Sequence, residues 1–211
     1  MKGFIIDYTL SYTAAPLMPI ETKNVVELYL QTQNWDEVKK KVIDDDILQK
    51  PTLDSRKRVF SELKKRLLNL TQPELEHFSD ASMDDVKVLS LVSCLKTYRL
   101  MYEFVLEVIR EKYLMFDYTI EPSDYSSFIE SKEVSSPKLS GISETTHYKL
   151  KQVLFLILAD VGLIESTKNH YITKPMLSEA VIKILLADNP KLLSALLMNN
   201  DEIAHYAKRE E

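Results

Sequence analysis

The chain has 211 residues, a formal net charge of −5 at pH 7 and only three glycines. With 45% hydrophobic and 28% charged residues, its composition is that of a folded globular protein and excludes an intrinsically disordered one. Because tight turns between strands and phosphate-binding loops both need glycine, the composition favours helices and excludes the common nucleotide-binding fingerprints.

The hydropathy of the chain argues against a membrane protein. Its longest uninterrupted apolar run, Val153–Ala159, has seven residues, whereas a membrane-spanning helix needs about 20. The N-terminal apolar patch is too short for an export signal. A single cysteine, Cys94, cannot form an internal disulfide, and we expect it to be buried as a small hydrophobic residue. We therefore expect a soluble, cytoplasmic protein without a membrane partner.

The N-terminal quarter predicts an extended lead-in followed by three short helices. The first helix covers residues 21–31, and the second begins after Asn34, which forms a capping-box pattern with Glu37. The second helix should end at the acidic run of residues 44–46, because acids are unfavourable at a helix C-terminus. The third begins at Thr52 or Asp54. Three short helices of which the third is basic are typical of a helix-turn-helix-like unit.

The middle of the chain predicts a central helix and a polar connection. Residues 86–114 are almost continuously apolar, so we expect one long helix that is covered on several sides. Within it, Arg99 should pair with Glu103. A segment rich in Ser and Pro follows, with a short helix at residues 123–132. We place a domain boundary near Gly141, which gives an N-terminal helical domain over residues 1–140 and a C-terminal domain over residues 141–211.

The C-terminal domain has a different pattern. A helix over residues 143–161 should end at Gly162, and two short β-type runs, 163–165 and 171–173, flank a turn. A helix followed by a small hairpin is typical of a winged helix.

Two more helices, at residues 178–186 and 190–198, and a frayed tail complete the chain. The predicted fold class is therefore mostly all-α, with an N-terminal helix-turn-helix-like helical bundle and a C-terminal winged-helix-like part that carries a small β-hairpin.

The third helix is the first candidate binding surface. Residues 50–67 hold seven Lys or Arg against two acids, a local charge of +5 in an acidic chain. On a helical wheel most of these cations lie opposite the apolar stripe, which favours duplex DNA, whose phosphates release counterions when neutralised. A solvated helix face is the alternative. The candidate DNA-contacting residues here are Lys50, Ser55, Arg56, Lys57, Arg58, Ser61, Lys64 and Lys65.

The start of the helix over residues 143–161 is the second candidate. Its first turns are polar, and a recognition helix inserts such an end into the major groove. Winged helices also serve as protein-interaction modules, so this alternative stays open. The candidate contacts on this helix and on the hairpin are Thr145, Thr146, Tyr148, Lys149, Gln152, Lys168 and Lys174.

Enzymatic and metal-binding interpretations have little support in the sequence. The four histidines have no partners at metal-ligand spacing, and no cysteine pair exists. The acidic run at residues 44–46 points in three directions on a helix, which does not suit a cation site. No nucleophile elbow or HExxH motif occurs. We therefore expect no enzyme activity, metal, cofactor or small-molecule substrate.

Several motifs resemble those of the BrxA family, the small accessory proteins of bacteriophage exclusion (BREX) systems. The resemblance covers residues 17–198 and includes "ETKNVVELYLQTQNWDEVKKKVIDDDILQKPTLDSRKRVFSELKKRL", "LKTYRLMYEFVLEVIREKYL" and "ITKPMLSEAVIKILL". Its most specific pieces are the helix start at 35–37, residues 48–50, the basic cluster 55–58, and "KTYR" at 96–99.

The resemblance implies an all-α protein that binds DNA, has no catalytic activity, and acts beside the methyltransferase, ATPase and phosphatase-like components in phage defence. It supplies no catalytic residues. Two alternatives stay open: a protein–protein adaptor whose basic face docks an acidic partner, and an RNA-binding helical module.

Overall fold

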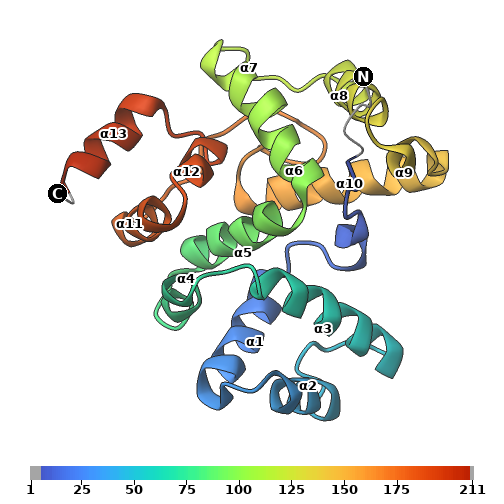
Figure 1. Ribbon diagram of the computed structural model, residues 1–211, viewed down its shortest axis with the longest axis vertical. Coiled ribbons are helices and arrows are strands. Elements are labelled where there is room, and N and C mark those ends of the chain that lie inside the picture. Colours follow the sequence, from blue (N-terminus) through green and yellow to red (C-terminus); the bar gives the residue numbers. More distant parts are fainter. Residues whose placement is uncertain (1–5, 210–211) are drawn as a thin grey trace.

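Helices form the regular structure of residues 6–209, which the computed structural model describes (Figure 1). The N-terminal half contains a short 3-10 turn, η1 (Ser11–Ala14), and then α1 (Pro19–Thr32), α2 (Trp35–Asp44), α3 (Leu53–Leu67), α4 (Gln72–His77), α5 (Met83–Thr97) and α6 (Arg99–Phe104). A π-helical turn, η2 (Val105–Arg110), then leads into α7 (Glu111–Leu114), α8 (Pro122–Glu133), α9 (Pro137–Ser140), α10 (Glu144–Val161), α11 (Glu179–Asp188), α12 (Lys191–Ala195) and α13 (Asn200–Arg209).

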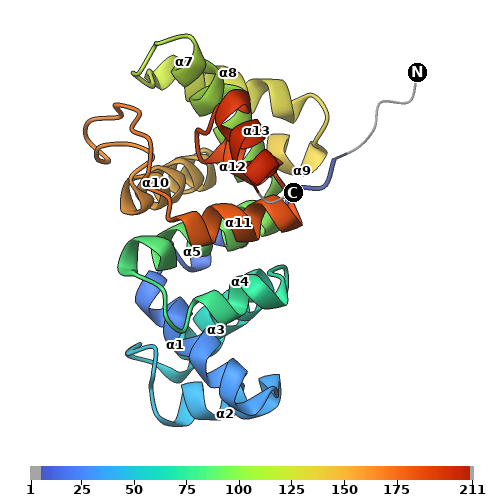
Figure 2. The ribbon, with the colours of Figure 1, turned by 90° about the vertical axis from the view of Figure 1, so that its left-hand side faces the viewer.

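Helix α5 lies at the centre of the molecule. In both views α1–α4 lie on one side of it and α6, α10 and α12 on the other (Figures 1 and 2). Its residues 88–95 are all buried, including Cys94 as predicted, and it packs against α1, α3 and α10. One cluster of buried side chains runs from Tyr8 to Met198. The division of the chain at residues 140 and 141 stays a prediction.

Several predicted helix ends are confirmed. The Asn34 side chain accepts hydrogen bonds from the backbone N–H groups of Asp36 and Glu37, at 2.9 and 3.4 Å, and so caps α2. Thr52 caps α3 in a capping box with Ser55. Gly162 adopts φ 80°, the left-handed conformation that ends α10 and that glycine tolerates without strain.

The predicted β-hairpin is wrong, and with it the winged-helix-like part. No strand forms within residues 6–209, and residues 163–173 make a loop with isolated bridges between Ile164 and Ile172 and between Thr119 and Tyr171. Residues 171 and 173 form backbone hydrogen bonds to residues 165 and 163, as in a hairpin, whereas residues 170 and 172 bond to residues 120 and 118. Each contact is an isolated bridge that does not extend into a ladder. The loop is thus held both by its own turn and by a segment some 50 residues earlier in the chain.

The predicted long helix over residues 86–114 is also wrong, because it breaks at Tyr98. This residue adopts an extended conformation, φ −113° and ψ 92°, between α5 and α6. Its ring is fully buried, and its hydroxyl bonds both Glu62 and Arg66 of α3. A continuous helix would not place the ring there. The predicted pair between Arg99 and Glu103 does form, at 2.6 Å.

The chain end also differs from the prediction of a frayed tail. Residues 200–209 form α13, whose Glu202 carboxylate pairs with Lys174 at 2.6 Å and accepts a hydrogen bond from the Asn199 backbone N–H at 2.8 Å. The Asn199 side chain in turn accepts from the Glu202 N–H and so caps the helix. This pairing joins α13 to the segment that precedes α11.

Candidate nucleic-acid interface

Helix α3 presents an apolar stripe to the core and carries cations on its other sides. Val59, Phe60, Leu63 and Leu67 are buried against the neighbouring helices. The positive charges that the sequence places on this helix fall into two groups, which differ in whether the fold supplies them with a partner.

Three of the cations predicted to contact DNA form ion pairs within the fold. Lys50 lies 3.3 Å from Glu21 on α1. The Arg56 guanidinium binds Asp46 through two nitrogens, at 2.8 and 2.9 Å, and also donates to two backbone carbonyls. Their charge is therefore largely compensated before any ligand arrives.

Lys65 is also a predicted DNA contact, but its ammonium lies 2.7 Å from the carboxylate of Glu62. It also donates to the hydroxyl of Ser11. The Glu62 carboxylate is buried, and Lys65 reaches it because the two residues are three positions apart on α3 and so lie on the same side of the helix. Lys65 is thus part of the fold's internal charge balance.

Arg66 is 1% exposed and is the positive centre of this network. Its guanidinium donates to the Tyr98 hydroxyl and to the Pro16 carbonyl, each at 2.8 Å, and to the Ala15 carbonyl. Tyr98 in turn donates to Glu62. Burial raises the pKa of the Tyr98 hydroxyl, so it stays protonated and able to donate.

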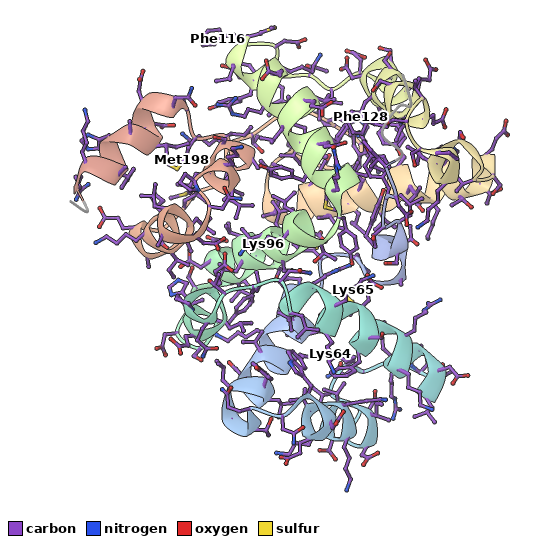
Figure 3. All side chains as sticks on the ribbon, viewed as in Figure 1. Lys64, Lys65, Lys96, Phe116, Phe128 and Met198 are labelled. Carbon is purple, nitrogen blue, oxygen red and sulfur yellow. The ribbon has the colours of Figure 1, made fainter. Side chains whose placement is uncertain are left out.

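The remaining cations of α3 are free. Lys57 and Arg58 are exposed, with Ser61 beside them, and neither has an ion-pair or hydrogen-bond partner among residues 6–209. Lys64 is half-buried over the Trp35 ring, 5.5 Å from its centroid, also without a carboxylate partner in that range. Figure 3 shows Lys64 and Lys65 on α3, in the half of the molecule that holds α1–α4. We call Lys57, Arg58, Ser61 and Lys64 the α3 face.

Helix α2 does not extend the positive charge of the α3 face. Its three consecutive lysines, residues 39–41, are exposed, but so are Asp36, Glu37 and Asp44 on the same helix and Asp45 at its C-cap. With the cap included, four acids stand against three lysines, so α2 contributes no net positive charge to the surface.

A second surface forms where α10 meets the loop after it. Figure 2 shows this segment, in orange, looping out beside α10. A groove of about 790 Å³ lies between them. We call it the α10 groove, and its lining residues are Tyr148, Lys149, Lys151, Gln152, Val153, Phe155, Leu156, Thr167, Lys168 and His170.

Aromatic rings and lysines make up most of the α10 groove. The buried Phe155 ring lies 4.3 Å from the His170 imidazole, measured between centroids. The Lys151 ammonium lies over the rings of Tyr125 and Phe155, at 5.1 and 5.8 Å. Tyr148 is 68% exposed at the rim. There is no carboxylate among the described residues that line the groove.

The structure thus brings together four of the residues predicted in the C-terminal part, namely Tyr148, Lys149, Gln152 and Lys168. Thr145 and Thr146 are exposed one turn earlier, outside the groove, where Ser143 caps the helix through the Thr146 N–H. Lys174 does not line the groove and instead forms an ion pair with Glu202 of α13, at 2.6 Å.

Sequence reasoning missed Lys151, Phe155 and His170. Lys151 could have been found from its place between Lys149 and Gln152 on a polar turn. Phe155 belongs to an apolar run, and His170 is a lone histidine in a loop. Their proximity arises only when the loop folds back on α10, so no local pattern indicates it.

Two further properties of the described chain bear on function. No helix within residues 6–209 is long and apolar enough to cross a membrane. In the same range no three His, Cys, Asp or Glu side chains come together in a way that could hold a metal ion.

Comparison with known proteins gives consistent matches over most of the chain. The family model described as BrxA matches residues 6–189. A Bacillus cereus (strain H3081.97) protein named BREX protein BrxA is 31% identical over 181 residues, which cover 85% of this chain and 90% of that protein. An Escherichia coli O9:H4 (strain HS) protein of the same name is 22% identical over 158 residues, covering 74% of this chain and 73% of that protein.

A solved structure supports the fold. The crystal structure of an uncharacterized protein from Magnetospirillum magneticum superimposes with a TM-score of 0.79 at 20% sequence identity. The match covers 90% of this chain and 97% of that one. At this identity the likeness concerns the fold alone.

Proposed function

Because the chain belongs to the BrxA family, we propose that it acts in bacteriophage exclusion as a DNA-binding protein without catalytic activity. Family membership points to a role in BREX phage defence, since two relatives are named as BREX proteins. Double-stranded DNA is the proposed ligand, and the methyltransferase, ATPase and phosphatase-like components of the system are the proposed protein partners.

The α3 face is the observation that supports duplex binding. Lys57 and Arg58 are exposed neighbours without a partner among the described residues, and Ser61 lies one turn further along the same side. Phosphates of a duplex would replace the solvent around these cations and release condensed counterions. Ser61 and the cations are also the side-chain types that contact phosphate oxygens most often.

The test is a charge reversal that leaves the internal ion pairs intact. The double variant Lys57→Glu/Arg58→Glu changes only exposed side chains, so each substitution should alter the free energy of unfolding by about 0.5 kcal/mol or less. Lys65 is kept, because Lys65→Glu would place a second carboxylate beside Glu62. Anisotropy with a labelled duplex, thermal unfolding and a phage plaque assay are measured on the same preparations.

We expect the double variant to lose duplex affinity by about tenfold or more at low salt and to weaken phage defence, with an unchanged melting temperature. The matched control is Lys191→Glu/Lys208→Glu, two exposed lysines on α12 and α13 with no described partner, which makes the same change in net charge. It should bind like the wild type. Wild-type affinity in the α3 variant would refute the proposal. Loss of defence in a folded variant, when wild-type protein binds no duplex, would establish the adaptor alternative.

A further inference from the structure

We propose that the α10 groove binds an unpaired nucleotide of single-stranded DNA. This goes beyond duplex binding by the α3 face, because it concerns a separate surface with different chemistry. It rests on three features of the groove: its uncompensated charge, its aromatic rings, of which Tyr148 is exposed, and its size.

The positive charge of the groove favours an anionic ligand. Lys149 and Lys168 have no ion-pair partner among residues 6–209, and Lys151 lies over two aromatic rings without a carboxylate partner. Three ammonium groups thus line one hollow in a chain of net charge −5. Lys65 and Lys174, by contrast, each pair with a glutamate within the fold. Like the α3 face, the groove leaves its cations available to a ligand.

The aromatic rings of the groove indicate which class of anion it binds. Tyr148 offers an exposed ring at the rim, and Phe155 and His170 lie together below it. Proteins that bind single strands combine a cationic groove for the backbone with aromatic rings on which unpaired bases stack. An inorganic phosphate or an acidic peptide would contact the lysines but has no base that would stack on these rings. Gln152 adds an amide that can both donate to and accept from a base edge.

The size of the groove excludes a duplex from its interior. Its volume of about 790 Å³ lies within the range of about 300–1,000 Å³ in which proteins hold small organic ligands. A paired base keeps its faces stacked on its neighbours, so only an unpaired base can present a face to Tyr148. Outer phosphates on either side of that nucleotide are within the reach of long lysine side chains at the rim.

The proposal is tested on the full chain with a labelled oligothymidine as the probe, by anisotropy at several salt concentrations. Tyr148→Ala should weaken oligothymidine binding about tenfold, because it removes one stacking surface. Tyr148→Phe keeps the ring and should retain the affinity. The matched control is Phe116→Ala, since Phe116 is 81% exposed on the turn after α7, outside the groove (Figure 3).

The lysines are tested separately through the salt dependence. Lys149→Gln/Lys168→Gln removes two phosphate contacts, so the negative slope of log affinity against log salt should become shallower by about 1.4 for a single strand. The control Lys191→Gln/Lys208→Gln should leave the slope unchanged. Melting temperatures should stay within error, because both lysines of the test pair are exposed.

The α3 variant separates this proposal from the previous one. Lys57→Glu/Arg58→Glu should retain most of the oligothymidine affinity while losing duplex affinity. No oligothymidine binding, or equal binding by wild type and Tyr148→Ala, would overturn the groove proposal and leave the duplex proposal standing. Equal losses of duplex and single-strand affinity in Tyr148→Ala would overturn the preference for an unpaired base. Displacement by polyglutamate with no effect of Tyr148→Ala would identify an acidic protein partner instead.

Discussion

Helices α3 and α10 both carry clustered lysines or arginines, but the fold treats the two clusters differently. On and beside α3, Lys50, Arg56 and Lys65 pair with acids, and Arg66 is buried in a hydrogen-bonded network. In the α10 groove no described lining residue is an acid. The local charge of +5 in the sequence therefore overstates what α3 can offer a ligand.

The comparison teaches that charge density along the sequence is not the charge available at a surface. Glu21 lies 29 positions before Lys50, and Asp46 lies ten positions before Arg56, yet each forms its pair in the folded chain. The α10 groove shows the opposite case. Its three lysines look sparse in the sequence, and they act together because Lys168 returns to α10 from the loop.

The largest expected effect comes from breaking the internal network on α3. Arg66→Met removes a buried guanidinium and leaves the Ala15 and Pro16 carbonyls and the Tyr98 hydroxyl without their donor. Breaking a buried charge network from one side typically costs about 3–5 kcal/mol of unfolding free energy. For a chain of this size that corresponds to a melting temperature lower by about 10 °C.

The control for this prediction is Arg58→Met on the exposed side of the same helix, which should change stability by about 0.5 kcal/mol or less. Denaturant titrations of the two variants measure the difference. A melting temperature for Arg66→Met equal to that of the wild type would mean that the buried guanidinium contributes no net stability, and the contrast between the two sides of α3 would be lost.

A medium effect is expected in the salt dependence of duplex binding. If the free cations Lys57, Arg58 and Lys64 neutralise three phosphates, the slope should be about −2.7, so raising salt from about 50 to 200 mM lowers affinity about 40-fold. If the paired cations Lys50, Arg56 and Lys65 are also released to DNA, six contacts give a slope of about −5.4 and a loss of about 1,800-fold. Affinity measured across this range by anisotropy distinguishes the two.

The smallest expected effect is a dependence of stability on pH through Glu62. Burial on its own raises the pKa of this carboxyl, but hydrogen bonds from Lys65, Tyr98 and Ser11 outweigh it and hold the pKa below the usual 4.5. Since the pKa is lower in the folded than in the unfolded state, the stabilisation is fully present above pH 4.5 and is lost as the pH falls through the folded value.

The free energy of unfolding of Glu62→Gln should therefore change less steeply below pH 4.5 than that of the wild type. Urea titrations at a series of pH values measure both slopes. Glu130→Gln, an exposed change on α8, serves as the control and should follow the wild-type curve. Parallel curves for Glu62→Gln and wild type would show that the paired side of α3 does not hold this carboxylate in its charged form.

Part of the fold and little of the site could be predicted from the sequence. The caps at Asn34, Thr52 and Gly162 are confirmed, because a cap depends on a few neighbouring residues and the backbone groups they satisfy. In place of the predicted hairpin, isolated bridges hold residues 163–173 to one another and to Thr119, and the long helix fails because burial of the Tyr98 ring breaks it. Both errors come from contacts between distant segments.

The sequence by itself determined the helical fold class, the family and the positions of the basic residues, since these depend on composition, periodicity and motifs within short windows. Only the tertiary structure decided which of those residues remain available. It paired Lys50, Arg56 and Lys65 with acids, buried Arg66, and folded the 163–173 loop against α10 to form a groove without a carboxylate among its described lining residues. The physical reason is that ion pairing, burial and groove formation depend on distances in space, which distant parts of the chain set together.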